Sequence, residues 1–172
     1  MENNAPKIGK FSLNYGLILG GLGVIFGLML FLSDAYVTQS PVNSIINIAM
    51  STGVIFWGIL NFRKANGGYL KVGQALKLGA GIALIAGIFS VLWTMLLSNV
   101  LDPEFPSKIM DLQMAELAET TDMTPEQLQQ QKEIGLNFFW FTYPVILIAS
   151  IVMGLIIGLV GGLIFKKAAP DY

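Results

Sequence analysis

Hydrophobic residues gather in four long runs along the chain, and polar connectors separate these runs. A helix needs roughly 20 apolar residues to cross a hydrocarbon layer about 30 Å thick. Each run meets that length without a charged residue, whereas buried helices of soluble proteins rarely stay uncharged for so long. We therefore predict an all-α polytopic membrane protein, a single integral membrane domain over residues 1–172, with transmembrane helices at about 11–32, 43–62, 78–101 and 137–165.

The first run could also be a secretory signal peptide, because Lys7 and Lys10 precede it. The hydrophobic region of a signal peptide is normally about 7–15 residues long and ends in small residues at a cleavage site. This run is longer, and FLSDAYV at its end is a poor cleavage site. We expect a transmembrane helix that is retained.

The connector between the third and fourth runs is the largest polar segment of the chain. Pro103 and Pro106 end the preceding helix and allow a new one to begin. Apolar residues then recur at helical spacing as far as about residue 119, at Ile109, Met110, Met114 and Leu117. The pattern predicts a short amphipathic helix in the first half of this connector.

A second helix is predicted in the other half of the same connector. Thr124 suits an N-cap, Pro125 the first helical position and Gln127 the capping-box position. The helix can continue through Gly135 into the fourth span, where Pro144 either kinks it or marks the end of the polar part. Together the two helices form a predicted extracytoplasmic hairpin over about 103–136.

Lysine and arginine are unevenly distributed among the connectors. Eight of the ten lie in the N-terminal segment, the 63–77 segment and the C-terminal segment, and only Lys108 and Lys132 lie elsewhere. Such a bias places the basic loops of a membrane protein in the cytoplasm. We expect both termini and the 63–77 loop to be cytoplasmic and the acidic 102–136 connector to lie outside. Besides Lys7 and Lys10, the residues that set this topology are Arg63, Lys64, Lys71, Lys77, Lys166 and Lys167.

The composition excludes most familiar enzyme chemistry. The chain has no Cys and no His, which removes disulfides, thiolate metal sites, Cys nucleophiles and the commonest general base. No Asp, Glu, Lys or Arg lies within the four predicted spans, although ion and proton pathways usually need one there. The acids of the 102–136 connector show no calcium-loop spacing. We expect no enzyme activity, no cofactor and no metal.

Small and polar residues recur at helical spacing within the spans. In the first and fourth spans, glycines lie four residues apart, at Gly16 and Gly20, Gly23 and Gly27, and Gly154, Gly158 and Gly162. Such glycines let helix backbones approach closely in lipid. They predict packing within a compact bundle, with homodimerisation as the alternative. In the second span, Asn43, Asn47 and Ser51 share one helix face, which favours hydrogen bonds between helices over the lining of a pathway.

Two helix ends resemble each other. The segments GILNFRKANGGY (58–69) and GGLIFKKAAPDY (161–172) share an apolar helix end, an aromatic residue and two cations. The second and fourth spans would end on the same side, so a duplicated helical hairpin is geometrically allowed. The alternative is that helices leaving the cytoplasmic face commonly end in this way for interfacial reasons.

Three motifs link the chain to a known family: FRKANGGYLKVGQALKLG from residue 62, LDPEF from residue 101, and MTPEQLQQQKE from residue 123. In their order and spacing they resemble the DUF4199 family of small integral membrane proteins, over nearly the whole chain. The resemblance implies a bacterial inner-membrane protein of four helices, the third beginning near Tyr69. The function of that family is unknown, so the resemblance supplies no catalytic residue.

For function, the sequence favours a non-enzymatic structural or accessory component of a membrane complex. The polar outer hairpin is the expected surface for a partner. The alternative is a small transporter or channel subunit that is active only as an oligomer. The expected partners are the lipid bilayer and a membrane protein or further copies of the chain, and not nucleic acid, because the charge of the 62–77 connector is explained by topology.

Overall fold

The computed structural model describes residues 6–38 and 40–167. Its helices are α1 Ile8–Leu32, α2 Pro41–Ala65, α3 Val72–Leu96, α4 Phe105–Thr120, α5 Pro125–Asn137 and α6 Thr142–Phe165. A π-helical turn, η1 (Leu97–Leu101), follows α3, and a 3₁₀ turn, η2 (Phe139–Phe141), precedes α6. Four helices are long and apolar enough to cross a membrane: α1, α2, and α3 and α6 with their adjoining turns. The prediction of an all-α, multi-pass membrane protein is confirmed.

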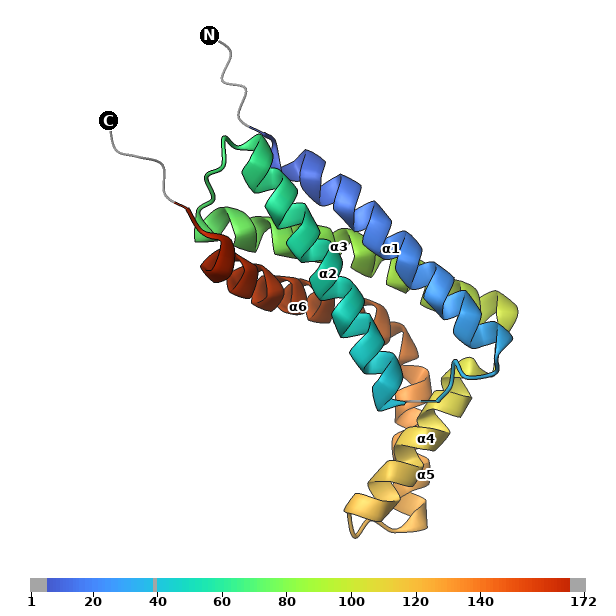
Figure 1. Cartoon of the computed structure of the whole chain (residues 1–172). Helices are drawn as coiled ribbons and strands as arrows, with labels where there is room; N and C mark the ends of the chain where they lie inside the picture. The colour runs from blue at the N-terminus through green and yellow to red at the C-terminus, as the bar shows by residue number, and fades with distance from the viewer. Residues whose placement is uncertain (1–5, 39, 168–172) are drawn as a thin grey trace.

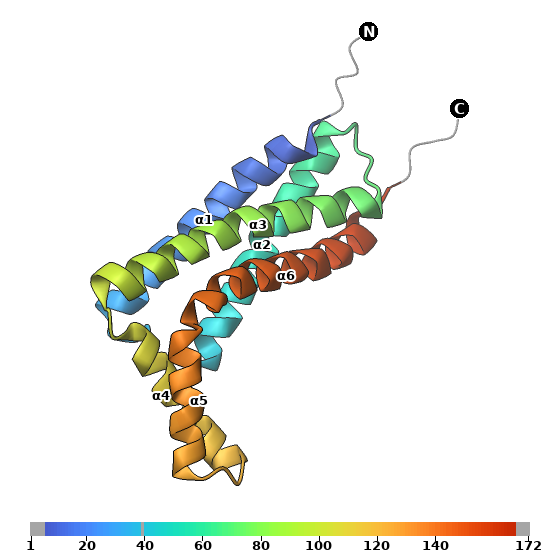
Figure 2. The same ribbon diagram turned by 180° about the vertical axis from the view of Figure 1, so that it is seen from behind.

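Helix α3 lies at the centre of the bundle. It packs along α1 on one side and α6 on the other, and α2 crosses all three with less extensive contacts (Figures 1 and 2). The largest side chains that are fully buried come from α2, α3 and the loop between them: Ile55, Ile59, Phe62, Leu70, Leu78 and Ile82. The apolar core therefore lies in the half of the bundle that contains the α2–α3 loop.

The two ends of the bundle differ in charge. At one end lie the start of α1, the α2–α3 loop and the end of α6; at the other, α4 and α5 form a hairpin that projects from the bundle (Figure 1). We call these the basic end and the hairpin end. The basic end carries the eight lysines and arginines that the sequence assigned to one side: Lys7, Lys10, Arg63, Lys64, Lys71, Lys77, Lys166 and Lys167.

A tight loop connects α2 to α3 at the basic end. Gly67 and Gly68 have φ angles of 67° and 85°, a left-handed conformation that residues with a Cβ adopt at a cost. The Arg63 Nε donates a hydrogen bond to the Gly68 carbonyl at 3.0 Å. The amides of Leu70 and Lys167 each donate to the other's carbonyl, both at 3.0 Å. The α2–α3 loop is thus joined to the end of α6 through the backbone.

That contact brings together the two similar sequence segments, 58–69 and 161–172. The pairing residues are Leu70, directly after the first segment, and Lys167, within the second. Residues 168–172, the last part of the second segment, lie outside the described residues. A pairing between the ends of two helices fits a duplicated hairpin and the interfacial alternative equally, and the origin of the resemblance stays a prediction.

Glycines lie at the closest approach of the helices. On α1, a Cβ added to Gly16, Gly20 or Gly27 would collide with a side chain of α3, in each case a large one: Ile85, Phe89 and Trp93 in turn. On α6, Gly154, Gly158 and Gly162 face α3 at Gly79, Ala83, Ala75 and Val72. At five of these six glycines an added Cβ would lie less than 3.0 Å from an atom of α3, and at Gly162 it would lie 3.0 Å from the Ala75 Cβ, so all six belong to close helix contacts.

Gly23 departs from the predicted packing role. A Cβ there would meet no side chain or backbone atom of another helix within 4 Å. Gly23 faces a cleft between the helices instead. Its spacing from Gly27 was correct for a helix face, but the neighbouring helices do not close on this part of α1.

The helix boundaries differ from the predicted spans in two places. Helix α3 begins at Val72, about six residues before the apolar run, which places Lys77 inside the helix and agrees better with the start near Tyr69 that the family resemblance implied. Helix α5 does not continue into the fourth span, because the backbone breaks at Phe138 (φ −103°, ψ 15°) and forms η2. Pro144 lies in the first turn of α6, where its missing N–H leaves no hydrogen bond unmade.

Candidate functional site

The α4–α5 hairpin is the polar surface of the molecule, and its turn follows the sequence signals. The Gln127 amide donates to the Thr124 Oγ1 at 3.3 Å, and the Thr124 amide donates to the Gln127 Oε1 at 2.8 Å. This is the predicted capping box, with Pro125 in the first helical position. The N–H groups of Thr124 and Gln127 at the start of α5 are therefore satisfied without contacts from the rest of the protein.

Two contacts hold α4 and α5 together. The Lys132 Nζ forms an ion pair with the Asp111 carboxylate across the hairpin. Farther toward the bundle, α5 approaches α4 closely at Gly135, where a Cβ would overlap the Met110 sulfur. The amphipathic positions predicted for α4 thus face α5 at Met110, although none of the α4 or α5 residues is fully buried.

Three polar side chains from separate segments meet where the hairpin joins the bundle. The Tyr36 hydroxyl donates a hydrogen bond to the Asp102 Oδ2 at 2.6 Å. The Lys108 Nζ donates to the same oxygen at 2.8 Å, and the Glu104 amide donates to the Asp102 Oδ1 at 3.2 Å. We call Tyr36, Asp102 and Lys108 the root cluster. It connects the α1–α2 connector, the end of η1 and the first turn of α4.

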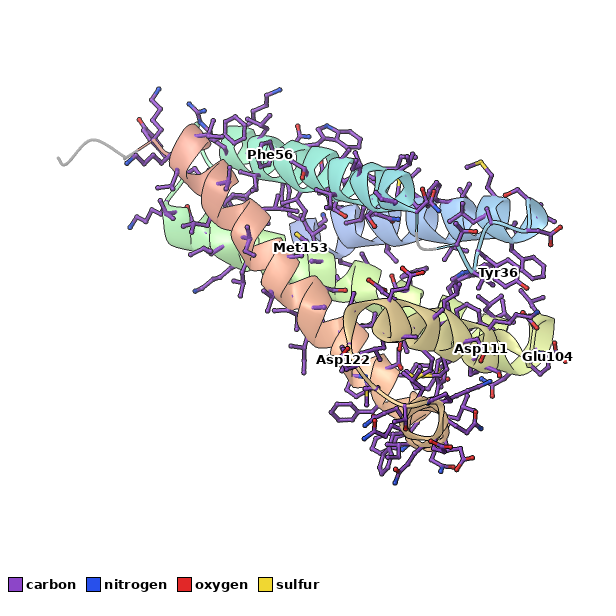
Figure 3. The ribbon with its side chains drawn as sticks, turned by 90° about the horizontal axis from the view of Figure 1, so that it is seen from below. Tyr36, Phe56, Glu104, Asp111, Asp122 and Met153 are labelled. Carbon is purple, nitrogen blue, oxygen red and sulfur yellow. The ribbon has the colours of Figure 1, made fainter. Side chains whose placement is uncertain are left out.

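Position within the fold explains how the root cluster forms. The π-helical turn η1 ends α3, and the Asp102 amide donates to the Leu97 carbonyl at 2.8 Å. Figure 3 shows Tyr36 on the side of the hairpin where Glu104 begins α4, with Asp122 at the opposite end of that helix. Tyr36 therefore reaches the root of the hairpin and not its tip.

The Asp102 side chain is 11% exposed and the Lys108 side chain 39%, so this carboxylate is largely removed from water while its cation remains accessible. The hydrogen bonds from Lys108 and Tyr36 hold the pKa of Asp102 below its usual 3.8. The hydrogen bond to Asp102 raises the pKa of Tyr36 above 10.0 and that of Lys108 above 10.5. The cluster thus keeps one carboxylate, one ammonium and one neutral phenol across the physiological pH range.

Aromatic rings surround the root cluster. Tyr36 lies 5.2 Å from Phe31 at the end of α1 and 6.1 Å from Phe105 at the start of α4, measured between ring centroids. Phe105 continues to Phe139 of η2 at 6.4 Å, and Phe139 to Tyr143 of α6 at 6.3 Å. This row of rings joins α1, α4, η2 and α6.

Beyond its root, the hairpin exposes an acidic surface. Residues 103–137 contain seven acids and two lysines, and both lysines take part in ion pairs. Among the ion pairs of the described residues, none involves the remaining acids of the outer part: Glu116, Glu119, Asp122, Glu126 and Glu133. Within the described ranges these acids form no group of three that could hold a metal ion. The surface can therefore offer a broad negative field to a partner.

Sequence reasoning missed the root cluster. Asp102 was one of eight acids in the outer connector, Lys108 counted only as an exception to the charge bias, and Tyr36 drew no attention. Tyr36 and Asp102 are 66 residues apart, so no helical spacing relates them. A usable signal was the position of one lysine shortly after an acid at a helix end, within an otherwise acidic segment.

The model of the family described as "Protein of unknown function (DUF4199)" matches residues 14–167. The chain belongs to this family. No curated protein and no solved structure matches the chain. The root cluster and the whole hairpin fall inside the DUF4199 match, so both are part of the domain that the family describes.

Proposed function

We propose that this DUF4199 protein is a non-enzymatic accessory component of a membrane complex, and that the α4–α5 hairpin is its docking surface. The observation that carries the proposal is the contrast within the hairpin. Its root is fixed to the bundle by the root cluster. Its outer acids, by contrast, take part in none of the ion pairs among the described residues. A projecting, acidic element that is anchored at its root suits a partner with a basic surface.

We further propose that the protein lies in a bacterial inner membrane with the basic end in the cytoplasm and the hairpin outside. The support is the bias of lysine and arginine, eight of ten at one end. A reporter fused after Lys167 should be active only in the cytoplasm, and one inserted near Thr121 only outside. The opposite pattern would overturn the orientation.

Crosslinking in native membranes tests the docking surface. A photoreactive amino acid replaces Glu119 or Glu126 on the hairpin, or Ile25 on α1 as the control, because Ile25 is 66% exposed on a membrane-facing helix. We expect one discrete protein adduct from the hairpin positions and only lipid adducts from Ile25. The adduct should disappear when Glu116, Asp122 and Glu133 are replaced by amides. The proposal would be contradicted if the protein with the photoreactive residue kept the mass of the monomer after irradiation, or if the amide substitutions left the adduct unchanged.

The second candidate is a small transporter or channel subunit that is active as an oligomer. A cleft of about 290 Å³ between the four membrane-spanning helices favours it, since Ser and Asn side chains contribute to its lining. Flux measurements in proteoliposomes, together with the oligomer mass in native-like detergent, separate the two candidates. A monomer that carries no flux would contradict transport and leave the accessory function standing.

A further inference from the structure

The cleft between the four membrane-spanning helices lies in the half of the bundle nearer the hairpin. It has a volume of about 290 Å³, and a smaller cavity of about 200 Å³ shares Gly23, Asn47 and Ser90 with it. All four helices contribute to the lining, which makes the cleft a central feature of the bundle. Its volume equals roughly ten water molecules at their liquid density, enough for the polar end of a lipid and the first part of its chain.

The cleft exists because α2 packs with only one of its halves. Ile55 and Ile59 in the second half are completely buried, whereas Val42 and Ile45 in the first half are 61% and 64% exposed. The absence of a side chain at Gly23 leaves further space on the opposite wall. The first half of α2 is thus exposed on almost all sides, and its Asn47, together with Met50 and Ser51, borders the opening.

The polar side chains of the cleft do not join the helices. The Asn47 Nδ2 donates to the Asn43 carbonyl at 3.0 Å, the Ser90 Oγ to Ala86 at 3.2 Å, and the Ser150 Oγ to Ile146 at 2.7 Å. Each bond stays within one helix, so for Asn47 the predicted hydrogen bond between helices was wrong. These bonds engage one of the two N–H groups of Asn47 and the hydroxyl hydrogens of Ser90 and Ser150. The side-chain oxygens of three helices therefore keep acceptor capacity toward the cleft, while the second N–H of Asn47 and the hydroxyl of Ser51, which also lines the cleft, can still donate.

Charge and polarity narrow the class of ligand. The residues that line the cleft include no Asp, Glu, Lys or Arg, and a charged group without a counter-ion is costly at this depth. The Asn47 amide bonds within its own helix through one N–H. Its remaining polar atoms belong to an exposed residue on a membrane-spanning helix, and polar atoms that lack a partner in hydrocarbon are unfavourable. A ligand that fits is uncharged, and a group that both donates and accepts hydrogen bonds matches the free oxygens and the remaining donors of the lining.

We propose that the cleft binds a neutral lipid with a free hydroxyl group. The hydroxyl donates to the oxygens of Asn47, Ser90 and Ser150, and the hydrocarbon chain passes Met50 and Met153, whose flexible thioethers adapt to chains of different shape. Met153 is labelled on α6 in Figure 3. The part of the chain that exceeds the cleft lies on the exposed first half of α2. This site is independent of the hairpin and of its proposed partner.

The test uses the full-length protein in phosphatidylcholine nanodiscs and a photoreactive long-chain alcohol, with the methyl ether of the same alcohol as the matched control. The ether keeps the chain and the oxygen but cannot donate a hydrogen bond. We expect the alcohol to label the segments around Met50 and Met153 roughly tenfold more than the ether does, the ratio for one lost hydrogen bond. Equal labelling by both probes, or labelling spread over the lipid-facing surfaces, would overturn the proposal.

Two pairs of variants locate the site. Gly23→Leu fills the cleft without a collision at its Cβ, and Gly21→Leu adds the same side chain to the same helix, also into open space, but outside the cleft. Asn47→Leu removes an acceptor, and Asn61→Leu removes the same kind of side chain, with its bond to the Trp57 carbonyl, elsewhere on α2. Labelling should fall only in Gly23→Leu and Asn47→Leu. Unchanged labelling in Gly23→Leu, in a variant with normal thermal unfolding, would contradict the site.

Discussion

The basic end and the hairpin end of the bundle are held together by different kinds of contact. At the basic end, fully buried apolar side chains such as Phe62 and Leu78 fill the space between helices, and glycines bring α3 and α6 into backbone contact at Gly79 and Gly154. At the hairpin end, α2 stands partly free of the bundle and a cleft remains open. There the connection depends on the root cluster and a row of aromatic rings.

This difference in packing makes the basic end the stable part of the bundle and the hairpin end the part that can adapt to a ligand or partner. Close packing has no low-energy alternative arrangement, so the basic end should behave as a rigid unit. Polar contacts at an interface with water can exchange with water, and an open cleft can accept a ligand or close. Both surfaces proposed to bind something, the cleft and the hairpin, lie in the half where packing is incomplete.

The largest effect on stability is expected from adding a methyl group at the tightest helix contact of the basic half. In Gly79→Ala the new methyl group would overlap the Gly154 carbonyl oxygen, which belongs to backbone and cannot turn away. We expect destabilisation by about 2–3 kcal/mol, measured by unfolding in mixed micelles. Gly53→Ala is the control, because a Cβ there meets open space on a membrane-spanning helix. Similar stability of the two variants would disprove the packing account of the basic end.

A smaller and local effect is expected at the root cluster. Asp102→Asn removes the negative charge to which Lys108 and the Tyr36 hydroxyl both donate hydrogen bonds. Because water can solvate the Lys108 ammonium in its place, the free energy of unfolding should fall by only roughly 1 kcal/mol. Hydrogen exchange in α4 should rise about fivefold while exchange in α3 stays unchanged. Glu104→Gln is the matched control: that side chain lies 3.9 Å from Lys108 but is 82% exposed. Faster exchange in α3 as well would show that the two ends are one cooperative unit.

The elements that the sequence predicted well are those that depend on local chemistry. Uninterrupted apolar runs identified the membrane-spanning helices, and Thr124 and Gln127 identified the start of α5 through a bond between near neighbours. The start of α3 was placed too late because Gln74 and Lys77 interrupt the apolar pattern. The Gln74 side chain in fact accepts a bond from the Lys71 amide at 2.9 Å, which caps the helix before the apolar run begins.

The features that the sequence did not predict depend on contacts between distant segments. The break at Phe138 lies inside a continuous apolar and aromatic run, where hydrophobicity gives no sign of a turn. Gly23 has the same spacing as the packed glycines, yet only the position of α2 decides that it borders a cleft. The root cluster requires knowing that the α1–α2 connector lies against the start of α4. These are the parts of the structure that carry the proposed functions.

Extremes of pH should act on the hairpin end before the basic end. The pKa of Asp102 is lowered in the folded protein. Its contribution to the free energy of unfolding is therefore complete above pH 3.8 and is lost as the pH falls through the lower pKa of the folded state. The pKa of Lys108 is raised in the folded protein. Its contribution to the free energy of unfolding is therefore complete below pH 10.5 and is lost as the pH rises through the higher pKa of the folded state. Protease cleavage near Thr121 should therefore increase only below about pH 4 or above about pH 10.5. The increase in cleavage at low pH should disappear in Asp102→Asn. If the increase persists in that variant, it arises from other acids of the hairpin.

The smallest effect is expected from the ion pair across the hairpin. The Asp111 side chain is 58% exposed and that of Lys132 22%, so water and salt screen their attraction. A double-mutant cycle with Asp111→Asn and Lys132→Gln should give a coupling free energy of about 0.5 kcal/mol at low salt, falling toward zero at about 1 M salt. The same cycle with Asp102→Asn and Lys108→Gln should give a larger value that depends less on salt, because Asp102 is largely buried. Equal coupling in the two cycles would mean that burial of Asp102 adds nothing, and the root cluster would then be one more surface ion pair and no anchor for the hairpin.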